Sequence, residues 1–232
     1  MRPQMNWRAA RAVAVAGAML LAAGVSERIA SAASSSPAVV AARSAGHRRR
    51  RGEPPRLQAL LLHPNVLIGR DVALVGVVSP GGAPRAVAVQ ARRGTRWIAV
   101  ARALTNRRGL FVERFWPRRL GRLQLRLRAS GVSVRHVLLR GSVATVYHEV
   151  IASWYGPGGV TACGEALGAT TQGVANKTLP CGTMVTLRYR GRSVRVPVID
   201  RGPYVAGRDY DLTYATRLAL GAGGVSQIWA SA

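Results

Sequence analysis

The sequence of 232 residues is poor in the residue types that hold metal ions and build disulfide frameworks. Two cysteines exclude a cysteine-rich scaffold and a four-cysteine zinc site, and four scattered histidines argue against a multi-histidine metal site. A nucleotide-binding loop is also missing, so the sequence predicts neither a metal nor a cofactor. Only nine residues are acidic, which restricts acid–base chemistry to few positions.

Lysine is nearly absent, and arginine supplies the positive charge. Lys177 is the only lysine among 34 basic residues, and the formal net charge is +25. Residues 33–142 hold 22 arginines and three acids, whereas residues 143–232 hold eight basic and five acidic residues. The excess therefore lies in the N-terminal half, where it predicts an anionic partner rather than a particular fold.

The first residues have the three parts of an export signal. Residues 1–11 are basic, residues 12–25 are an apolar run, and residues 30–32 (Ala-Ser-Ala) offer a cleavage site. This order predicts a signal peptide over residues 1–32. A retained membrane anchor is the alternative, but the run is short for a hydrocarbon core of about 30 Å. We therefore expect a secreted, cell-wall-associated protein without a stable membrane span after cleavage.

A linker and a β-rich segment follow. Residues 33–56 are largely Ser, Ala, Pro and Arg, which predicts a basic disordered linker. Over residues 57–142, seven short runs alternate apolar and polar residues between turns that contain Gly or Pro. This spacing is typical of an antiparallel, immunoglobulin-like β-sandwich. We expect Trp97, Phe111 and Phe115 in its core.

The outer faces of these predicted strands are rich in arginine. They are either merely solvated or attract anionic wall polymers, peptidoglycan carboxylates or lipid head groups. Export argues against nucleic acid as the partner.

Three sequence blocks in the last ninety residues occur in a specific order. They are A-S-W-Y-G at residues 152–156, T-L-P-C-G-T at 178–183, and D-R-G-P-Y at 200–204 with D-L-T at 211–213. Together they resemble the rare lipoprotein A (RlpA)-like double-psi β-barrel family, which is related to expansins and MltA-type lytic transglycosylases. The resemblance implies a six-stranded barrel over residues 147–232, with a groove for peptidoglycan glycan strands. The whole chain is thus expected to be all-β.

Local signals within this region predict individual elements. Residues 185–200 predict a β-hairpin, in which Pro197 indicates an edge or a bulge. Thr213 is a candidate N-cap for a short helix that begins at Tyr214. Residues 225–229 are expected to form a closing strand.

Carboxylates are the candidate catalytic groups, because cleavage of a glycosidic bond needs an acid that protonates the leaving oxygen. In a lytic transglycosylase one carboxyl can then deprotonate the sugar's own hydroxyl, which closes an anhydro ring. The resemblance implies Asp211 as the acid in the groove, and Glu165 matches the glutamate of the family's T-A-S-G-E block. Asp200 ends an apolar run at a strand-to-loop transition, where functional groups collect. Capping by the aspartates and solvation of Glu165 are the alternatives.

Two positions depart from the RlpA pattern. Asn176 stands where the lytic enzymes have a histidine, and Gly168 stands where they have an aspartate. Asparagine can orient a sugar amide but cannot transfer a proton near neutral pH. Two functions therefore stay open: a peptidoglycan lytic transglycosylase, and a non-catalytic, expansin-like module that binds or loosens the wall and is anchored by the basic sandwich.

Polar and aromatic residues of these loops predict the substrate contacts, because aromatic faces stack on sugar rings and arginines attract muramyl carboxylates. The expected contacts are Tyr204, Tyr155, Asn176, Arg201 and Thr161. Trp154 is expected in the barrel core.

Cys163 and Cys181 lie in the two loops that flank the presumed groove. In an oxidising compartment a disulfide between them would stiffen one wall of that groove. A nucleophilic cysteine is the alternative, but the nearest histidine in sequence is His148, fifteen residues before Cys163.

Overall fold

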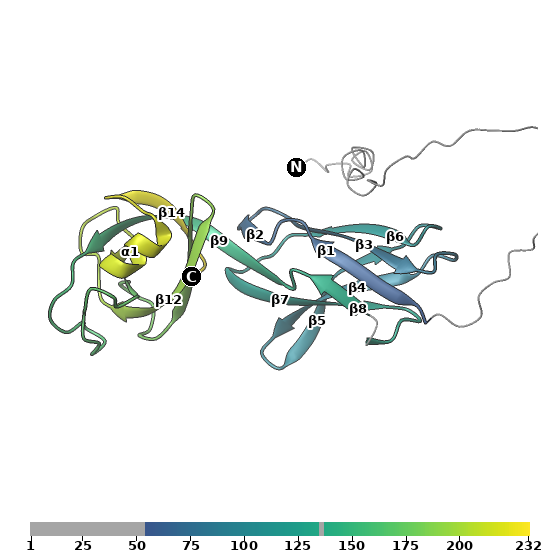
Figure 1. Ribbon diagram of the computed structural model, residues 1–232, viewed down its shortest axis with the longest axis horizontal. Helices are drawn as coiled ribbons and strands as arrows, with labels where there is room; N and C mark the ends of the chain where they lie inside the picture. Colours follow the sequence, from purple (N-terminus) through teal and green to yellow (C-terminus); the bar gives the residue numbers. More distant parts are fainter. Residues whose placement is uncertain (1–53, 135–136) are drawn as a thin grey trace, which may run out of the picture. The chain divides into compact units, whose positions relative to one another are not determined.

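The computed structural model describes residues 54–134 and 137–232 (Figure 1). The predicted signal peptide and nearly all of the predicted linker lie outside these residues. The described part of the chain is mostly β, with fourteen strands and one α-helix. None of its helices is long and apolar enough to cross a membrane.

The elements fall into an N-terminal unit, which consists of β1 to β8 and the first residues of β9, and a barrel, which consists of the rest. The strands of the N-terminal unit are β1 (Arg56–Leu61), β2 (Asn65–Leu67), β3 (Val72–Ser79), β4 (Ala86–Arg93), β5 (Arg96–Leu104), β6 (Leu110–Phe115), β7 (Gly121–Ala129) and β8 (Val137–Arg140). The further elements are β9 (Val143–Tyr155), β10 (Val174–Ala175), β11 (Met184–Tyr189), β12 (Arg192–Asp200), β13 (Tyr210–Thr213), α1 (Tyr214–Leu220) and β14 (Ser226–Ala230).

The N-terminal unit consists of two sheets that share one hydrophobic core (Figure 1). One sheet has the order β6-β3-β1-β8, and the other contains β5, β4, β7 and β9, with β2 paired to β9. All seven expected strands are present. Strand β2 was not expected, because three residues are too few to show an alternating pattern. The pairs β1–β8 and β2–β9 are parallel, so the expectation of a purely antiparallel arrangement was wrong.

The core of this unit contains two of the three expected aromatic residues. Phe111 and Phe115 are buried. Trp97 is only half-buried, because its ring lies at the surface, where the Arg126 guanidinium covers it at 4.4 Å. The stacked arginine covers the aromatic face in place of core residues.

Strand β9 is continuous between the N-terminal unit and the barrel. Its first residues pair with β7, and its later residues pair with β14 and β13. At the change between these partners the hydroxyl of Tyr147 donates a hydrogen bond of 2.8 Å to Asn65 Oδ1. The chain thus passes from one unit to the other within a strand rather than through a loop.

The barrel is a closed ring of six strands. Its pairings run β13-β10-β12-β11-β14-β9, and β13 also pairs with β9, which completes the ring. The expected hairpin is β11–β12, where Arg190 (φ 46°) and Gly191 (φ 86°) form the two-residue turn. Both residues have positive φ, as a tight hairpin turn that matches the strand twist requires.

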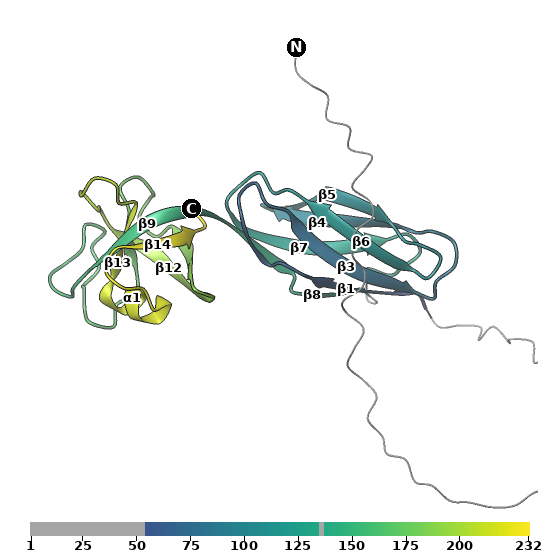
Figure 2. The same ribbon diagram turned by 90° about the horizontal axis from the view of Figure 1, so that it is seen from above.

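Helix α1 begins at Tyr214 with Thr213 as its N-cap, as expected, and lies against β12 and β13 (Figure 2). The hydroxyl of Thr213 accepts a hydrogen bond from the Thr216 backbone N–H, and both threonine hydroxyls accept from the Gly173 N–H. The Thr216 hydroxyl also donates to the Gly173 carbonyl at 2.9 Å. Because all of these groups are buried, the two threonines fix the chain where it enters β10.

We expect Thr216→Val to lower the free energy of unfolding by about 1–3 kcal/mol, because it leaves the buried Gly173 backbone groups with fewer partners. Denaturant titration measures this loss. Thr170→Val, at an exposed threonine, is the control and should stay within about 0.5 kcal/mol of the wild type. Equal losses in both variants would contradict the assigned role.

Candidate active site

The barrel register brings Asp200 and Asp211 to one face of the sheet. Ala175 of β10 pairs with Asp200 of β12 on one side and with Asp211 of β13 on the other. Asp211 pairs in turn with Ser153 of β9. Residues paired directly across neighbouring strands project from the same face. These four residues therefore form a row, here called the acidic row, in which the small Ala175 separates the two carboxylates.

Asp211 is half-buried in the acidic row. Its Oδ1 is buried and has no hydrogen-bond partner among the described residues. Burial raises the pKa of the Asp211 carboxyl, and the negative charge of Asp200 adds to this, whereas Ser153 and the Arg208 charge lower it. Because burial is the largest of these causes, the net shift favours the protonated acid.

Asp200 connects the acidic row to two loops. Its Oδ1 accepts hydrogen bonds from the backbone N–H of Ala162 at 2.9 Å and from that of Arg201 at 2.8 Å. The first of these N–H groups belongs to the T-A-C-G-E loop. Asp200 thus caps a loop, as one alternative had it, while its side chain stays in the acidic row with Asp211.

Two further polar side chains of β9 face the carboxylates. Ser153 and Tyr155 are two residues apart, so they project from the same side of the strand. Burial and the charges of Asp200 and Asp211 raise the pKa of the Tyr155 hydroxyl, which lies toward Asp200 without forming a hydrogen bond of good geometry. The Ser153 hydroxyl is also buried without a well-formed partner in the described chain. Three buried polar groups without good partners therefore meet at one place.

Arg201 and Asn176 hold the T-L-P-C-G-T loop. The Arg201 guanidinium donates to the carbonyls of Asn176 at 3.0 Å and Leu179 at 2.7 Å. The Asn176 Oδ1 accepts from the Thr178 and Leu179 N–H groups, and its Nδ2 donates to the Asp209 carbonyl. Both side chains thus support the loop from within. One Nδ2 hydrogen of Asn176 is left for a ligand.

The disulfide between Cys163 and Cys181 is present as predicted. It ties the T-A-C-G-E loop to the T-L-P-C-G-T loop, and the Cys163 N–H donates to the Ile199 carbonyl beside Asp200. Both loops are therefore anchored to the end of β12, where the first carboxylate lies.

Glu165 and Thr161 lie in the T-A-C-G-E loop and do not join the acidic row. Thr161 is buried, and its hydroxyl accepts from the Glu165 N–H. The Glu165 side chain is exposed and makes no ion pair or hydrogen bond with the described residues. The structure thus assigns Thr161 a part in the loop turn and leaves the Glu165 carboxylate in solvent.

Tyr204 and Trp154 differ in exposure and in their contacts. Tyr204 is 83% exposed in the loop after Asp200, as a sugar platform requires. Trp154 was expected in the barrel core, and this was wrong. The ring is 38% exposed, packs against Tyr214, and is covered by the Arg217 guanidinium at 4.5 Å. Ser153 and Tyr155 point to one side of β9, so Trp154 between them points to the other.

Sequence reasoning missed Ser153 and Arg208, both of which act on Asp211. The alternation of the A-S-W-Y-G block could have shown that Ser153 shares a face with Tyr155. The residues around Arg208 in the sequence do not distinguish it from the other arginines. Only the folded barrel shows that its charge lowers the pKa of Asp211.

Comparison with known proteins shows what this domain is similar to. Residues 147–228 match the family model described as lytic transglycolase. Over 80 residues the chain is 44% identical to the probable endolytic peptidoglycan transglycosylase RlpA of Aquifex aeolicus. It is 46% identical over 68 residues to the endolytic peptidoglycan transglycosylase RlpA of Campylobacter jejuni. The C-terminal domain is an RlpA-like double-psi β-barrel.

These matches cover only part of each protein. The Aquifex match spans 32% of this chain and 35% of the relative, and the Campylobacter match spans 27% and 25%. Among solved structures, the Streptomyces papain inhibitor matches with 27% identity and a TM-score of 0.32, over 37% of this chain and 92% of that one. The RlpA likeness therefore concerns the barrel.

We expect the double variant Cys163→Ser/Cys181→Ser to unfold with about 3 kcal/mol less free energy than the oxidised protein. The bond closes a loop with a sequence separation of 18, which constrains the unfolded chain. Denaturant titration measures the loss, and the reduced wild type is the control that should match the variant. An oxidised wild type no more stable than this variant would contradict the expectation.

Asp211→Asn should raise the free energy of unfolding near neutral pH. Because burial holds the folded-state pKa of this carboxyl above its ordinary 3.8, the folded state binds more protons than the unfolded state. The free energy of unfolding of the wild type therefore falls as the pH rises from 3.8 through the higher pKa of the folded state. The uncharged amide of the variant does not lose stability in this way. Denaturant titrations below pH 3.8 and near neutral pH should show the gain only at the higher pH.

Glu149→Gln is the control for this experiment, because Glu149 is exposed on the same strand as Ser153. Its effect on stability should be small at both pH values. An Asp211→Asn variant that is less stable than the wild type at neutral pH would show that its charged form is favoured in the fold.

Proposed function

We propose that the barrel binds peptidoglycan glycan strands and cleaves them as a lytic transglycosylase, with Asp211 as the acid and base. The observation that carries this proposal is a half-buried carboxyl, with a raised pKa, that is paired through Ala175 with a second carboxylate. The endolytic transglycosylase names of its RlpA relatives support the reaction class.

The reaction proceeds without water as a reactant. The protonated Asp211 donates its proton to the glycosidic oxygen, and the bond between that oxygen and the muramyl C1 breaks. The C6 hydroxyl of the same sugar then attacks C1, and the Asp211 carboxylate takes the hydroxyl proton as the 1,6-anhydro ring closes. The charge of Asp200 favours the protonated Asp211 before cleavage and stabilises the positive charge that develops at C1.

Residues around the acidic row position the sugars in this proposal. Tyr155 donates a hydrogen bond from its buried hydroxyl, and Tyr204 stacks on a sugar ring at the exposed end. Asn176 offers its remaining amide hydrogen to an acetamido group. Arg201 and Thr161 hold the loops beside the acidic row, and Glu165 is a solvent-exposed carboxylate of the T-A-C-G-E loop rather than the acid.

A second function, an expansin-like module that binds or loosens the wall without cleavage, is favoured by two positions. Asn176 replaces the histidine of the lytic pattern and is held by its own loop. Gly168 replaces an aspartate, and its N–H donates to Thr171 within a short turn. Under this function the barrel binds the same glycan strands but does not cleave them.

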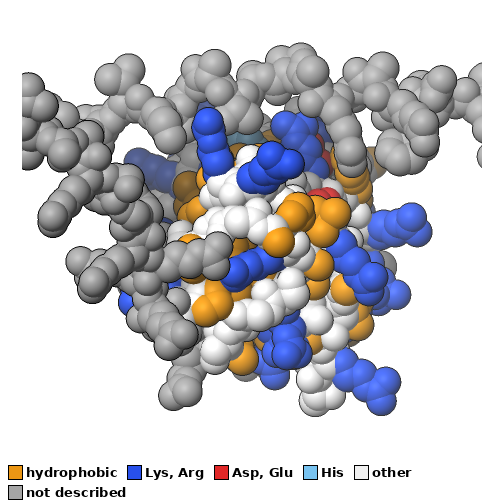
Figure 3. All heavy atoms as spheres, turned by 90° about the vertical axis from the view of Figure 1, so that its right-hand side faces the viewer, with side chains coloured by type: hydrophobic (Ala, Val, Ile, Leu, Met, Phe, Trp, Pro, Cys, Tyr) orange, Lys and Arg blue, Asp and Glu red, His pale blue; other side chains and the backbone are white. Residues whose placement is uncertain are grey.

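The N-terminal unit is proposed as an immunoglobulin-like sandwich that follows a signal peptide and a linker, and that holds the exported protein to anionic wall polymers. Figure 3 shows lysine and arginine side chains spread over one face of the molecule, with few acidic side chains among them. A face of this charge attracts polyanions and weakens its hold as salt rises.

The first test is to incubate the oxidised protein with purified glycan strands and to look for anhydro-muramyl ends by mass spectrometry. The wild type should produce them, and Asp211→Asn should reduce the rate by about a hundredfold or more, because the general acid is lost. Glu149→Gln should retain the wild-type rate. Glycan binding by Asp211→Asn, measured by pelleting with the wall, should persist.

Three outcomes decide between the two functions. Full activity of Asp211→Asn would move the acid to Asp200, which an Asp200→Asn variant then tests. Wall binding without anhydro ends in the wild type would establish the binding module. If the wild type neither binds nor cleaves the strands, both proposed functions are overturned.

A further inference from the structure

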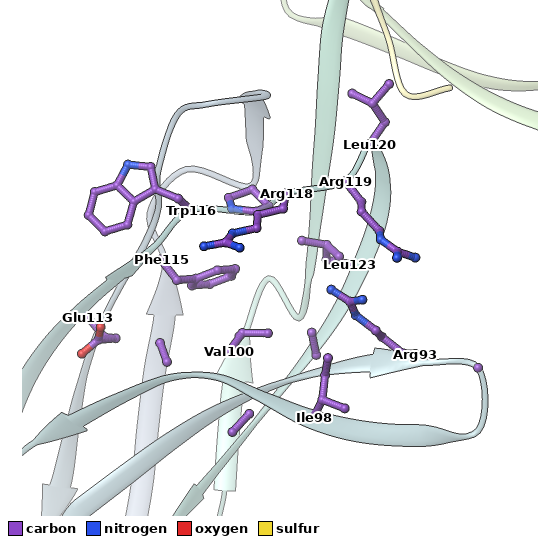
Figure 4. Close-up of a pocket in the computed structure, with 15 residues that line it drawn as sticks. Arg93, Ile98, Val100, Glu113, Phe115, Trp116, Arg118, Arg119, Leu120 and Leu123 are labelled. Atoms are coloured by element: carbon purple, nitrogen blue, oxygen red, sulfur yellow. The ribbon is translucent and has the colours of Figure 1, made fainter. Parts of the chain in front are cut away.

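The N-terminal unit contains a hollow with a volume of about 750 Å³, far from the acidic row in sequence. Its walls come from the end of β4, from β5, from the end of β6, from the β6–β7 connection and from the start of β7 (Figure 4). A volume of this size is in the range of small-molecule sites. The mechanism proposed for the barrel does not use it.

The floor of the hollow is apolar. Ile98 and Val100 of β5, Phe115 of β6 and Leu123 of β7 line it, and Figure 4 shows Leu123 and Val100 between the charged residues. Other than Glu113 at one side, the lining offers no side-chain hydrogen-bond acceptor. Such a floor favours a hydrocarbon rather than a sugar, because a sugar would bury hydroxyl groups without partners.

The rim of the hollow is positively charged. Arg93 lies on one side and Arg118 and Arg119 on the other, and in Figure 4 the guanidinium groups of Arg93 and Arg119 extend toward one another. These three arginines are exposed, and their side chains make no hydrogen bond or ion pair with another described residue. With Glu113 as the single acidic residue of the lining, the hollow keeps a net positive charge.

We propose that this hollow binds an anionic amphiphile, with its phosphate or carboxylate head between Arg93 and Arg119 and its hydrocarbon on Ile98, Val100 and Leu123. Two guanidinium groups can hold such a head through charge-assisted hydrogen bonds. The anion also relieves the repulsion between like charges that face one another. The apolar floor thus matches the hydrocarbon of the ligand, and the cationic rim matches its anionic head.

Dodecyl phosphate, used below its micelle concentration with the full chain, is the probe. Trp116 is 61% exposed at the rim, so its fluorescence should change on binding and titrate to saturation. A Trp116→Phe variant should lose most of this signal. Calorimetry of the same titration gives the affinity without the fluorophore.

Arg93→Gln/Arg119→Gln should weaken binding by roughly tenfold or more, since hydrogen bonds to the charged head are lost. Leu120→Asp should weaken it as well, because it adds a carboxylate to the lining at a position that is already 37% exposed. Arg107→Gln/Arg108→Gln is the matched control, which removes the same charge from a turn outside the hollow and should change the affinity by less than about twofold. Unchanged unfolding transitions verify that each variant is folded.

Three ligands complete the test. Inorganic phosphate and the uncharged dodecyl maltoside should each bind at least about tenfold more weakly than dodecyl phosphate, because each lacks one half of the ligand. Equal binding of either one would overturn the proposal, as would equal loss of affinity in the matched control. Tighter binding of poly(glycerol phosphate) through the same arginines would assign the rim to a wall polymer instead.

Discussion

The candidate active site depends on one constraint, the pairing of the two-residue strand β10 between β12 and β13. Ala175 is the single residue that separates Asp200 from Asp211, and it pairs with both. Two carboxylates on one buried face repel each other and resist desolvation, so side-chain forces alone would move them apart. The barrel prevents this, because either strand could leave β10 only by opening a closed ring of backbone hydrogen bonds.

The position of β10 is itself determined from outside the acidic row. Gly173 precedes the strand, and its backbone groups bind the hydroxyls of Thr213 and Thr216. A Cβ at Gly173 would lie 2.4 Å from the Ile199 side chain, which is next to Asp200. The same short segment therefore fixes the helix start, the strand and the spacing of the acids, and the disulfide adds the two loops to that frame.

Local patterns in the sequence predicted much of the fold, because alternation, turn residues and capping act over a few positions. The seven strands, the β11–β12 hairpin and Thr213 as N-cap are examples, whereas the disulfide was predicted from the expected oxidising compartment. The parallel pairs β1–β8 and β2–β9 were not predictable, since partner choice is settled by tertiary packing. For the same reason Asp200 and Asp211 could be named as candidates, but the part of Ser153 could not be seen before β9 and β13 were paired.

The replacement of the lytic histidine by Asn176 has a consequence for the mechanism. Asn176 Oδ1 is committed to the Thr178 and Leu179 N–H groups, so its side chain orders the loop and moves no proton. In the proposed reaction the proton transfers are therefore assigned to carboxylates. A pair of acids can do this when their environments differ. The Oδ1 atom of Asp211 is buried without a hydrogen-bond partner among the described residues, whereas Oδ1 of Asp200 accepts hydrogen bonds from two backbone N–H groups. The loss of the histidine therefore places the whole proposed reaction on the asymmetry between these two aspartates.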